Sequence, residues 1–300
     1  MNKSFFLVTF AVMIISFSAV ARGNSSFRPD AIYGRDDRRD VYQVDNRSFI
    51  TLARSTAAQI LEGDMDFNPA TNSYNVFSGT LQASMNLCSN AQFAKQSAAA
   101  NCSGFLVAPD LLVTAGHCVQ NMHECNGGYW VFDYKLENPA ALRISNIAAR
   151  QVYRCVEIIE QTLDDEAMND YALIRLDRVV TDRTPLKIRQ NGQISSGTSV
   201  VVVGHPSGLP TKISAGAVVI DNGPKNYFVT NLDTFAGNSG SAVFNAETNE
   251  IEGILVRGEE DYVPSPMGDC MIPRLCRESG DGCLGEHVTR ITNIAYLKGY

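Results

Sequence analysis

The stretch Leu111-Leu112-Val113-Thr114-Ala115-Gly116-His117-Cys118 decides the fold class of this 300-residue chain. Its first four residues are apolar or β-branched and predict a buried strand, and the small residues that follow predict a tight turn. That turn presents His117 at the end of the strand, where an imidazole can act as a base. Cys118 can close a disulfide onto Cys102 across a strand-turn-strand hairpin and stiffen the turn.

Two further segments carry groups that complement this imidazole. In Gly237-Asn238-Ser239-Gly240-Ser241 a serine lies between glycines, which allow a tight turn with an exposed hydroxyl. The backbone N–H groups of Gly237 and Ser239 can point to one spot in such a turn and stabilise an oxyanion. Asp170 stands at the mouth of an apolar strand, where a buried carboxylate can accept a hydrogen bond from an imidazole. The order His117, Asp170, Ser239 is one of three chain orders known for a Ser-His-Asp triad.

Short runs rich in β-forming residues recur along the chain with turn residues between them. Many short strands at near-even spacing predict an all-β sandwich or barrel. A charged connector, residues 181–198, divides the strand-rich region into two halves, and residues 89–100 and 290–297 are the sizeable helical candidates. The predicted strands are 74–82, 103–107, 111–114, 129–136, 152–159, 171–176, 199–203, 217–220, 227–231, 241–244 and 251–257.

Taken together, these segments resemble the trypsin/chymotrypsin superfamily of serine endopeptidases. The matching motifs are Thr-Ala-Gly-His117-Cys, Asp170-Tyr-Ala-Leu-Ile and Gly-Asn-Ser239-Gly-Ser. The last of them is similar to the bacterial glutamyl-endopeptidase branch. The resemblance implies a chymotrypsin-like fold of two six-stranded antiparallel β-barrels with the active site in the cleft between them, and we expect a short C-terminal helix. The Cys102–Cys118 disulfide also matches the family pattern.

The resemblance implies a division of the chain and a role for each residue. Residues 55–180 would form the first barrel with His117 and Asp170, and residues 199–300 would form the second barrel with Ser239 and the C-terminal helix. Ser239 would attack the scissile carbonyl, His117 would act as base and then acid, and Asp170 would orient His117. The amides of Gly237 and Ser239 would hold the oxyanion.

The same resemblance sets expectations about cofactors and partners. No metal or organic cofactor is expected, and the substrates would be proteins or peptides. Two alternatives stay open: a narrow-specificity protease similar to the exfoliative toxins, and a non-catalytic binding protein on a protease scaffold. The intact triad argues against the binding protein. Asn238 stands where the animal enzymes carry an aspartate, so activation by an ion pair with a freed N-terminal ammonium is not expected.

Substrate preference depends on two charged residues. Asp233 lies six positions before Ser239, where the trypsin branch has an aspartate that receives Arg or Lys. Acid-specific bacterial members place a histidine in the strand of the pocket wall, and Leu255 stands at that position here. The missing histidine favours a basic residue before the cleaved bond if Asp233 is unpaired, whereas an inward Arg257 would favour Glu or Asp. Arg257 could equally neutralise Asp233 or point to solvent. The predicted substrate-binding residues are Asp233, Thr234, Leu255, Val256 and Arg257.

Eight cysteines in an exported chain predict disulfides. The spacing contains no CxxC pair, which argues against structural zinc. Besides Cys102–Cys118, the sequence favours Cys125–Cys155. Cys88 would then join one of the last three cysteines, and the other two would pair; those three are Cys270, Cys276 and Cys283.

The N-terminus is typical of a secreted protein. Lys3, an apolar run and the ending Ala-Val-Ala21 predict a signal peptide, residues 1–21, that is cleaved after Ala21. Residues 22–54 would form a polar N-terminal arm, and the resemblance suggests that a short propeptide, up to about residue 31, is removed. The mature protein is therefore predicted to be secreted or periplasmic, without a membrane anchor.

Composition and charge exclude other classes. The hydrophobic fraction of 45% is that of a globular chain, and 25 basic against 32 acidic residues give a net charge of −7. Nucleic acid is therefore not expected as a partner, because the chain has no basic excess to neutralise phosphates. The remaining histidines, His123, His205 and His287, are predicted to be structural or exposed, with His205 in a loop.

Overall fold

The computed structural model describes residues 31–279 and 282–299. The predicted signal peptide, residues 1–21, lies outside these ranges. Across the described residues, no helix combines the length and the apolar character needed to span a membrane.

The first half of the chain forms a closed barrel of six antiparallel strands, in the order β10-β12-β13-β9-β8-β3. Most positions of these strands are buried, whereas β12 becomes partly exposed toward its C-terminal end. The strands are β3 (Thr56–Leu61), β8 (Cys102–Ala108), β9 (Leu111–Thr114), β10 (Gly128–Phe132), β12 (Val152–Asp164) and β13 (Asn169–Leu176).

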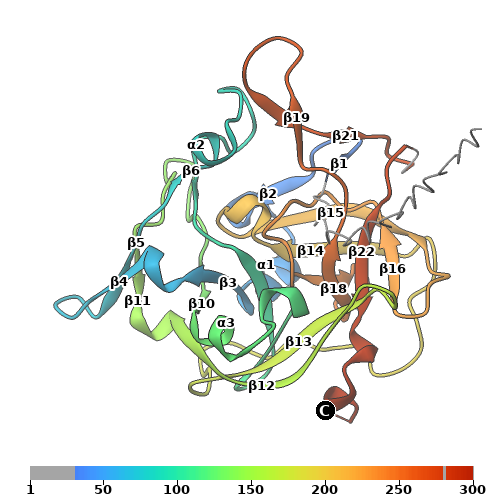
Figure 1. The fold of residues 1–300 in the computed structure, drawn as a ribbon, viewed down its shortest axis with the longest axis horizontal. Helices are drawn as coiled ribbons and strands as arrows, with labels where there is room; N and C mark the ends of the chain where they lie inside the picture. The colour runs from blue at the N-terminus through green and yellow to red at the C-terminus, as the bar shows by residue number, and fades with distance from the viewer. Residues whose placement is uncertain (1–30, 280–281, 300) are drawn as a thin grey trace, which may run out of the picture.

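The second half forms another six-stranded ring, in the order β14-β17-β18-β22-β16-β15, which the pairing of β14 with β15 closes. The N-terminal strand β2 (Arg38–Asp40) adds to the outer side of β15. The predicted double β-barrel is confirmed, and Figure 1 shows β3, β10 and β12 to the left of β14, β16 and β22. The strands of the ring are β14 (Ser199–Gly204), β15 (Lys212–Asp221), β16 (Tyr227–Thr230), β17 (Ala242–Asn245), β18 (Ile251–Arg257) and β22 (Glu286–Arg290).

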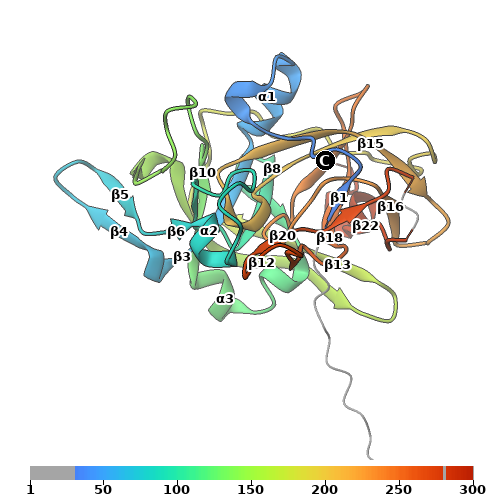
Figure 2. The ribbon, with the colours of Figure 1, turned by 90° about the horizontal axis from the view of Figure 1, so that it is seen from above.

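Smaller elements decorate the two barrels. Figure 2 shows α1 and α3 on opposite sides of the molecule. The short helices are α1 (Arg47–Ala53), α2 (Leu81–Met85) and α3 (Met122–Asn126). The 3-10 turns are η1 (Val41–Gln43), η2 (Glu62–Asp64), η3 (Gly116–Cys118), η4 (Ala149–Gln151), η5 (Pro206–Gly208), η6 (Ile291–Asn293) and η7 (Ala295–Leu297). The outer strands are β1 (Ile32–Tyr33), β4 (Met65–Asn68), β5 (Ser73–Val76), β6 (Gly79–Thr80), β7 (Ser97–Ala98), β11 (Asn146–Ala148), β19 (Tyr262–Pro264), β20 (Met271–Pro273) and β21 (Leu275–Cys276).

The helix predicted over residues 89–100 is wrong. This alanine-rich segment forms turns and the short strand β7, and Phe93 has a positive φ of 60°, which interrupts a helix. Its backbone carbonyls instead accept hydrogen bonds from the N–H groups at the start of α2. Tertiary contacts therefore override the helix propensity of alanine.

Two other local predictions need adjustment. The single strand predicted over residues 74–82 is divided into β5, β6 and the first turn of α2. The C-terminal helical segment begins after Arg290, which belongs to β22, and consists of the 3-10 turns η6 and η7.

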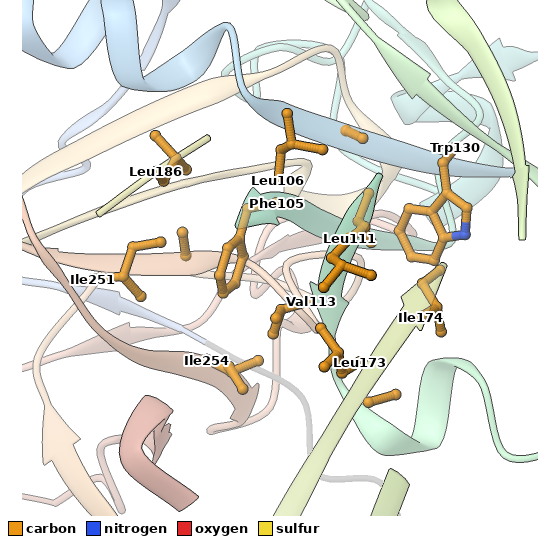
Figure 3. Close-up of a cluster of buried hydrophobic side chains, with 14 of the residues drawn as sticks. Phe105, Leu106, Leu111, Val113, Trp130, Leu173, Ile174, Leu186, Ile251 and Ile254 are labelled. Carbon is orange, nitrogen blue, oxygen red and sulfur yellow. The ribbon is translucent and has the colours of Figure 1, made fainter. Parts of the chain in front are cut away.

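One hydrophobic core runs through both barrels. Phe105 and Leu106 of β8 belong to the same buried cluster as Ile251 and Ile254 of β18. Figure 3 shows Leu186 from the connector beside these side chains. Because protein interiors are close-packed, this continuous core fixes the position of one barrel relative to the other.

All eight cysteines are paired in the structure. The disulfides Cys102–Cys118 and Cys125–Cys155 have the expected pairing. Cys88 joins Cys270, which leaves Cys276 paired with Cys283. The Cys88–Cys270 bridge ties the segment after α2 to the β19–β20 hairpin of the second half.

A buried histidine makes the stability of this fold sensitive to acid. His205 is fully buried, and its Nε2 lies 3.1 Å from Thr211 Oγ1. Burial, with a further contribution from the Lys212 ammonium, lowers the pKa of His205 to about 3. The unfolded chain therefore binds more protons than the folded chain between pH 6.5 and pH 3, so the folded state loses stability as the pH falls through that window.

We expect His205→Gln to flatten this pH dependence by up to about 1.4 kcal/mol per pH unit. The measurement is the free energy of unfolding in urea at pH 6.5, 5.5 and 4.5. Exposed His123→Gln serves as the matched control and should follow the wild-type curve. Parallel curves for wild type and His205→Gln would show that His205 does not carry the acid sensitivity.

Candidate active site

Strand β9 and the 3-10 turn η3 that follows it bring His117 onto Asp170. His117 Nδ1 lies 2.7 Å from Asp170 Oδ2, and both side chains are almost completely buried. The other carboxylate oxygen, Asp170 Oδ1, accepts hydrogen bonds from the N–H groups of Gly116 and His117 at 2.6 and 3.1 Å. Because the Asp170 carboxylate accepts a hydrogen bond from the Nδ1–H of His117, Nε2 is the unprotonated, basic nitrogen of the neutral imidazole.

Close packing explains the glycine before this histidine. A Cβ atom on Gly116 would lie 2.0 Å from the carbonyl oxygen of Thr162 on β12. Only glycine lets the turn approach β12 this closely, and this approach carries the turn N–H groups to Asp170. Gly116 therefore positions the imidazole of His117.

The Ser239 turn lies against the same part of the first barrel. Ser239 accepts a hydrogen bond at its carbonyl oxygen from Ser103 N–H at 2.8 Å, and Cys118 Sγ lies 3.8 Å from that oxygen. Cys118 follows His117, and Ser103 follows the disulfide partner Cys102. The structure therefore brings the backbone of Ser239 next to the segment that carries His117.

Glycines on either side of Ser239 take conformations that other residues disfavour. Gly237 has a φ of +93° and Gly240 a φ of +85°. A Cβ atom on Gly240 would lie 2.1 Å from the carbonyl oxygen of Ser103. These glycines let the turn bend sharply and pack directly on the first barrel.

Hydrogen bonds hold the peptide groups on both sides of Ala236, the residue before Gly237. The Ala236 carbonyl accepts a hydrogen bond from Ser207 N–H at 2.5 Å, and the Ala236 N–H donates to the Asp261 carboxylate at 3.1 Å. In a planar trans peptide the Gly237 N–H points away from the Ala236 oxygen, and so away from Ser207. Within the described ranges, the N–H groups of Gly237 and Ser239 have no hydrogen-bond acceptor, which leaves both able to bind an anionic oxygen.

Asp233 is not the unpaired carboxylate that a preference for basic residues would require. Its side chain is buried, with Oδ1 accepting from Tyr33 N–H and Oδ2 from Asp37 N–H, both at 2.7 Å. Burial raises the pKa of Asp233 to about 7. Both oxygens of this carboxylate are already hydrogen-bonded. The expectation that Asp233 receives a basic side chain required an unpaired carboxylate and is therefore not supported.

Thr234 contacts a buried carboxylate, that of Glu286, which the sequence analysis did not predict. Its hydroxyl donates a hydrogen bond to Glu286, which is completely buried on β22 and also accepts from Tyr33 Oη at 3.3 Å. Glu286 is not part of any recognisable motif. The only sign of its burial was that it begins a short strand whose other residues are mostly buried.

The three predicted residues on β18 point in different directions. Leu255 and Val256 are buried, and the backbone carbonyl of Leu255 holds the Ser239 turn by accepting from Gly240 N–H at 2.8 Å. Arg257 Nη2 lies 3.6 Å from Asp170 Oδ2, and the guanidinium also contacts the sulfur of Met168. Arg257 therefore lies beside the His117–Asp170 pair, an outcome that none of the three expectations for this residue included.

The N-terminal arm supports the loop that leads to Ser239. The Arg38 guanidinium stacks on Phe235 at 3.9 Å from the ring centre. Asp40 forms a fully buried ion pair with Lys212 at 2.6 Å, and Gln96 accepts from the same ammonium. Burial lowers the pKa of Lys212 to about 8. Strand β2 of the arm is thus joined to the second barrel by its pairing with β15 and by the buried ion pair.

One cluster of potential metal ligands occurs at this site. Ligand atoms of Cys102, His117 and Cys118 lie within 4.8 Å of one another. Both sulfurs belong to the Cys102–Cys118 disulfide, however, and a disulfide sulfur is not the thiolate that binds metals. The cluster therefore does not describe a metal site.

Two closed barrels with a histidine–aspartate pair and a glycine-flanked serine between them define the class of double-barrel peptidases. The family described as "Trypsin-like peptidase domain" matches residues 102–254, just over half of the chain. The chain belongs to this trypsin-like peptidase family. The matched range contains His117, Asp170 and Ser239.

A solved structure described as "Structure of Glu endopeptidase in complex with MPD" is similar to this chain. The sequence identity is 18%, the TM-score is 0.48, and the comparison covers 90% of this chain and 100% of the other. No curated protein sequence matches the chain.

Proposed function

We propose that the protein is an exported serine endopeptidase that hydrolyses peptide bonds through His117, Asp170 and Ser239. The observation that carries this proposal is the 2.7 Å contact between His117 Nδ1 and Asp170 Oδ2 in a peptidase-family chain. A buried carboxylate in this position fixes the imidazole tautomer and stabilises the imidazolium that forms during acyl transfer.

The proposed reaction has two halves. Ser239 Oγ attacks the scissile carbonyl while His117 Nε2 takes the hydroxyl proton, and the N–H groups of Gly237 and Ser239 hold the oxyanion. His117 then gives this proton to the leaving amine, which leaves an acyl-enzyme on Ser239. In the second half His117 activates a water molecule, which releases the acid product and restores Ser239.

Export is supported by the cysteines. The four disulfides involve all eight cysteines, and such bonds persist in oxidising compartments outside the cytosol. As a member of a peptidase family, the protein is expected to meet protein or peptide substrates there.

Covalent labelling tests the proposal directly. A peptidyl phosphonate with an aryl leaving group should react with the purified protein and add to Ser239, because the site activates that hydroxyl. Mass spectrometry of tryptic peptides should find the label on the peptide containing Ser239. A folded protein that stays unlabelled, as judged by its circular dichroism, would favour the non-catalytic binding protein instead.

A further inference from the structure

Ser103 joins the two barrels at the nucleophile turn. It is the second residue of β8 and is completely buried. Its N–H donates to the Ser239 carbonyl at 2.8 Å, and its Oγ donates to the Gly237 carbonyl, also at 2.8 Å. One residue of the first barrel therefore holds two carbonyl groups of a turn that belongs to the second barrel.

The side-chain bond acts on a glycine of that turn. Gly237 has no Cβ atom and a φ of +93°, so its own chemistry does little to restrict its backbone. The peptide before Gly237 is fixed by the Ser207 N–H, and the peptide after it is fixed by Ser103 Oγ. These two bonds together set both backbone angles of Gly237.

A buried network holds the Ser103 hydroxyl in place. Thr211 Oγ1 donates to the Tyr134 carbonyl at 2.8 Å, so it must accept from His205 Nε2 at 3.1 Å. In that tautomer, His205 Nδ1 is an acceptor that lies 3.1 Å from Ser103 Oγ, farther away than the Gly237 carbonyl oxygen at 2.8 Å. Ser103 Oγ accepts from the backbone N–H of His205 at 3.0 Å, and its own proton makes the shorter of the two contacts, the one to the Gly237 carbonyl.

We propose that the Ser103 hydroxyl is a positioning residue for the oxyanion-binding amides. This inference rests on the proposed function, because it concerns the same reaction. Ser103 touches neither substrate nor reacting atoms. It holds Gly237 so that its N–H converges with that of Ser239 before the substrate arrives, and preorganised donors of this kind stabilise the transition state more than the bound substrate.

Removing the hydroxyl should therefore lower kcat and leave KM nearly unchanged. Loss of an entire oxyanion donor costs roughly 10²–10³-fold in rate, and a donor that is only misaligned should cost less, so we expect Ser103→Ala to lower kcat about 10- to 100-fold. A peptide boronic acid that places an oxygen in the oxyanion site should bind more weakly by a similar factor. Ser103→Thr, which restores a hydroxyl, should recover most of the rate.

The measurements are made per active site. Titration with the phosphonate counts only molecules that react, so an unfolded fraction does not lower the rate. Thr114→Val is the matched control. It removes a buried hydroxyl that donates to the backbone carbonyl of Ser103, and it leaves the bond between Ser103 Oγ and Gly237 intact. If Ser103→Ala does not fold, the equal-sized pair Ser103→Thr and Ser103→Val gives the same comparison of a hydroxyl with a methyl group.

Three results would overturn the inference. The first is a wild-type kcat for Ser103→Ala, or for Ser103→Val relative to Ser103→Thr. The second is an equal loss in Thr114→Val, which would indicate general loosening of the barrel interface. The third is a rise in KM without a fall in kcat. Each of these assumes that the phosphonate labels the wild-type protein; if it does not, the proposed function itself fails, and the inference fails with it.

Discussion

Ser239→Ala is expected to lower kcat by about six orders of magnitude, as loss of a triad serine generally does. Alanine keeps the Ser239 backbone N–H and the carbonyl that accepts from Ser103 N–H, so the turn should keep its shape. The variant lacks only the oxygen that would form the acyl-enzyme. The measurement is hydrolysis of a peptide p-nitroanilide under single-turnover and steady-state conditions, with matched unfolding curves for both proteins.

Two serines help to interpret this experiment. Exposed Ser196→Ala should retain the wild-type rate and serves as the control for handling and purity. Ser241, which is buried and lies 3.2 Å from the side chain of Asn238, is the other hydroxyl in the turn. Retention of more than a few per cent of activity in Ser239→Ala would move the assignment of the nucleophile to Ser241.

Asp170→Asn is expected to lower kcat by about 10⁴-fold, the loss measured when a triad aspartate becomes an amide. The asparagine oxygen can still accept from the Gly116 and His117 N–H groups, so the η3 turn should stay in place. Its amide nitrogen would then face His117 Nδ1 and donate to it. That contact places the imidazole proton on Nε2, where it blocks the transfer of the Ser239 proton.

The variant should be compared with Asp165→Asn, which changes an exposed residue near the turn between β12 and β13. Both proteins should unfold at similar urea concentrations, whereas only Asp170→Asn should lose activity on the p-nitroanilide substrate. Activity within tenfold of wild type in Asp170→Asn would contradict the role assigned to this carboxylate.

Local sequence signals predicted those parts of the molecule that depend on neighbouring residues. The strand and small-residue turn before His117 required nothing beyond residues 111–118, and the structure has β9 and η3 there. The glycines around Ser239 likewise indicated a tight turn, and both adopt positive φ values. Family resemblance then supplied the arrangement of the barrels, which periodicity alone left open between a sandwich and a barrel.

The surroundings of the site depend on residues distant in sequence, and here sequence reasoning was weaker. Asp233 accepts a hydrogen bond from Tyr33 N–H, 200 positions earlier in the chain. The local sequence around either residue does not indicate that contact. Arg257 reaches Asp170 across the interface between barrels. The helix predicted over residues 89–100 is wrong for the same reason: carbonyl groups of this segment accept hydrogen bonds from N–H groups of α2, which lies outside the segment.

The pairing of β2 with β15 also has a consequence for the order in which the chain folds. Asp40 and Lys212, which form the buried ion pair at this junction, are 172 positions apart. During synthesis the arm leaves the ribosome long before its partner strand exists, and closing so long a loop is entropically costly until β15 is already in place. Docking of the arm therefore requires that β15 has already formed, and Asp233, which accepts from the Tyr33 and Asp37 N–H groups of the arm, reaches its final surroundings only then.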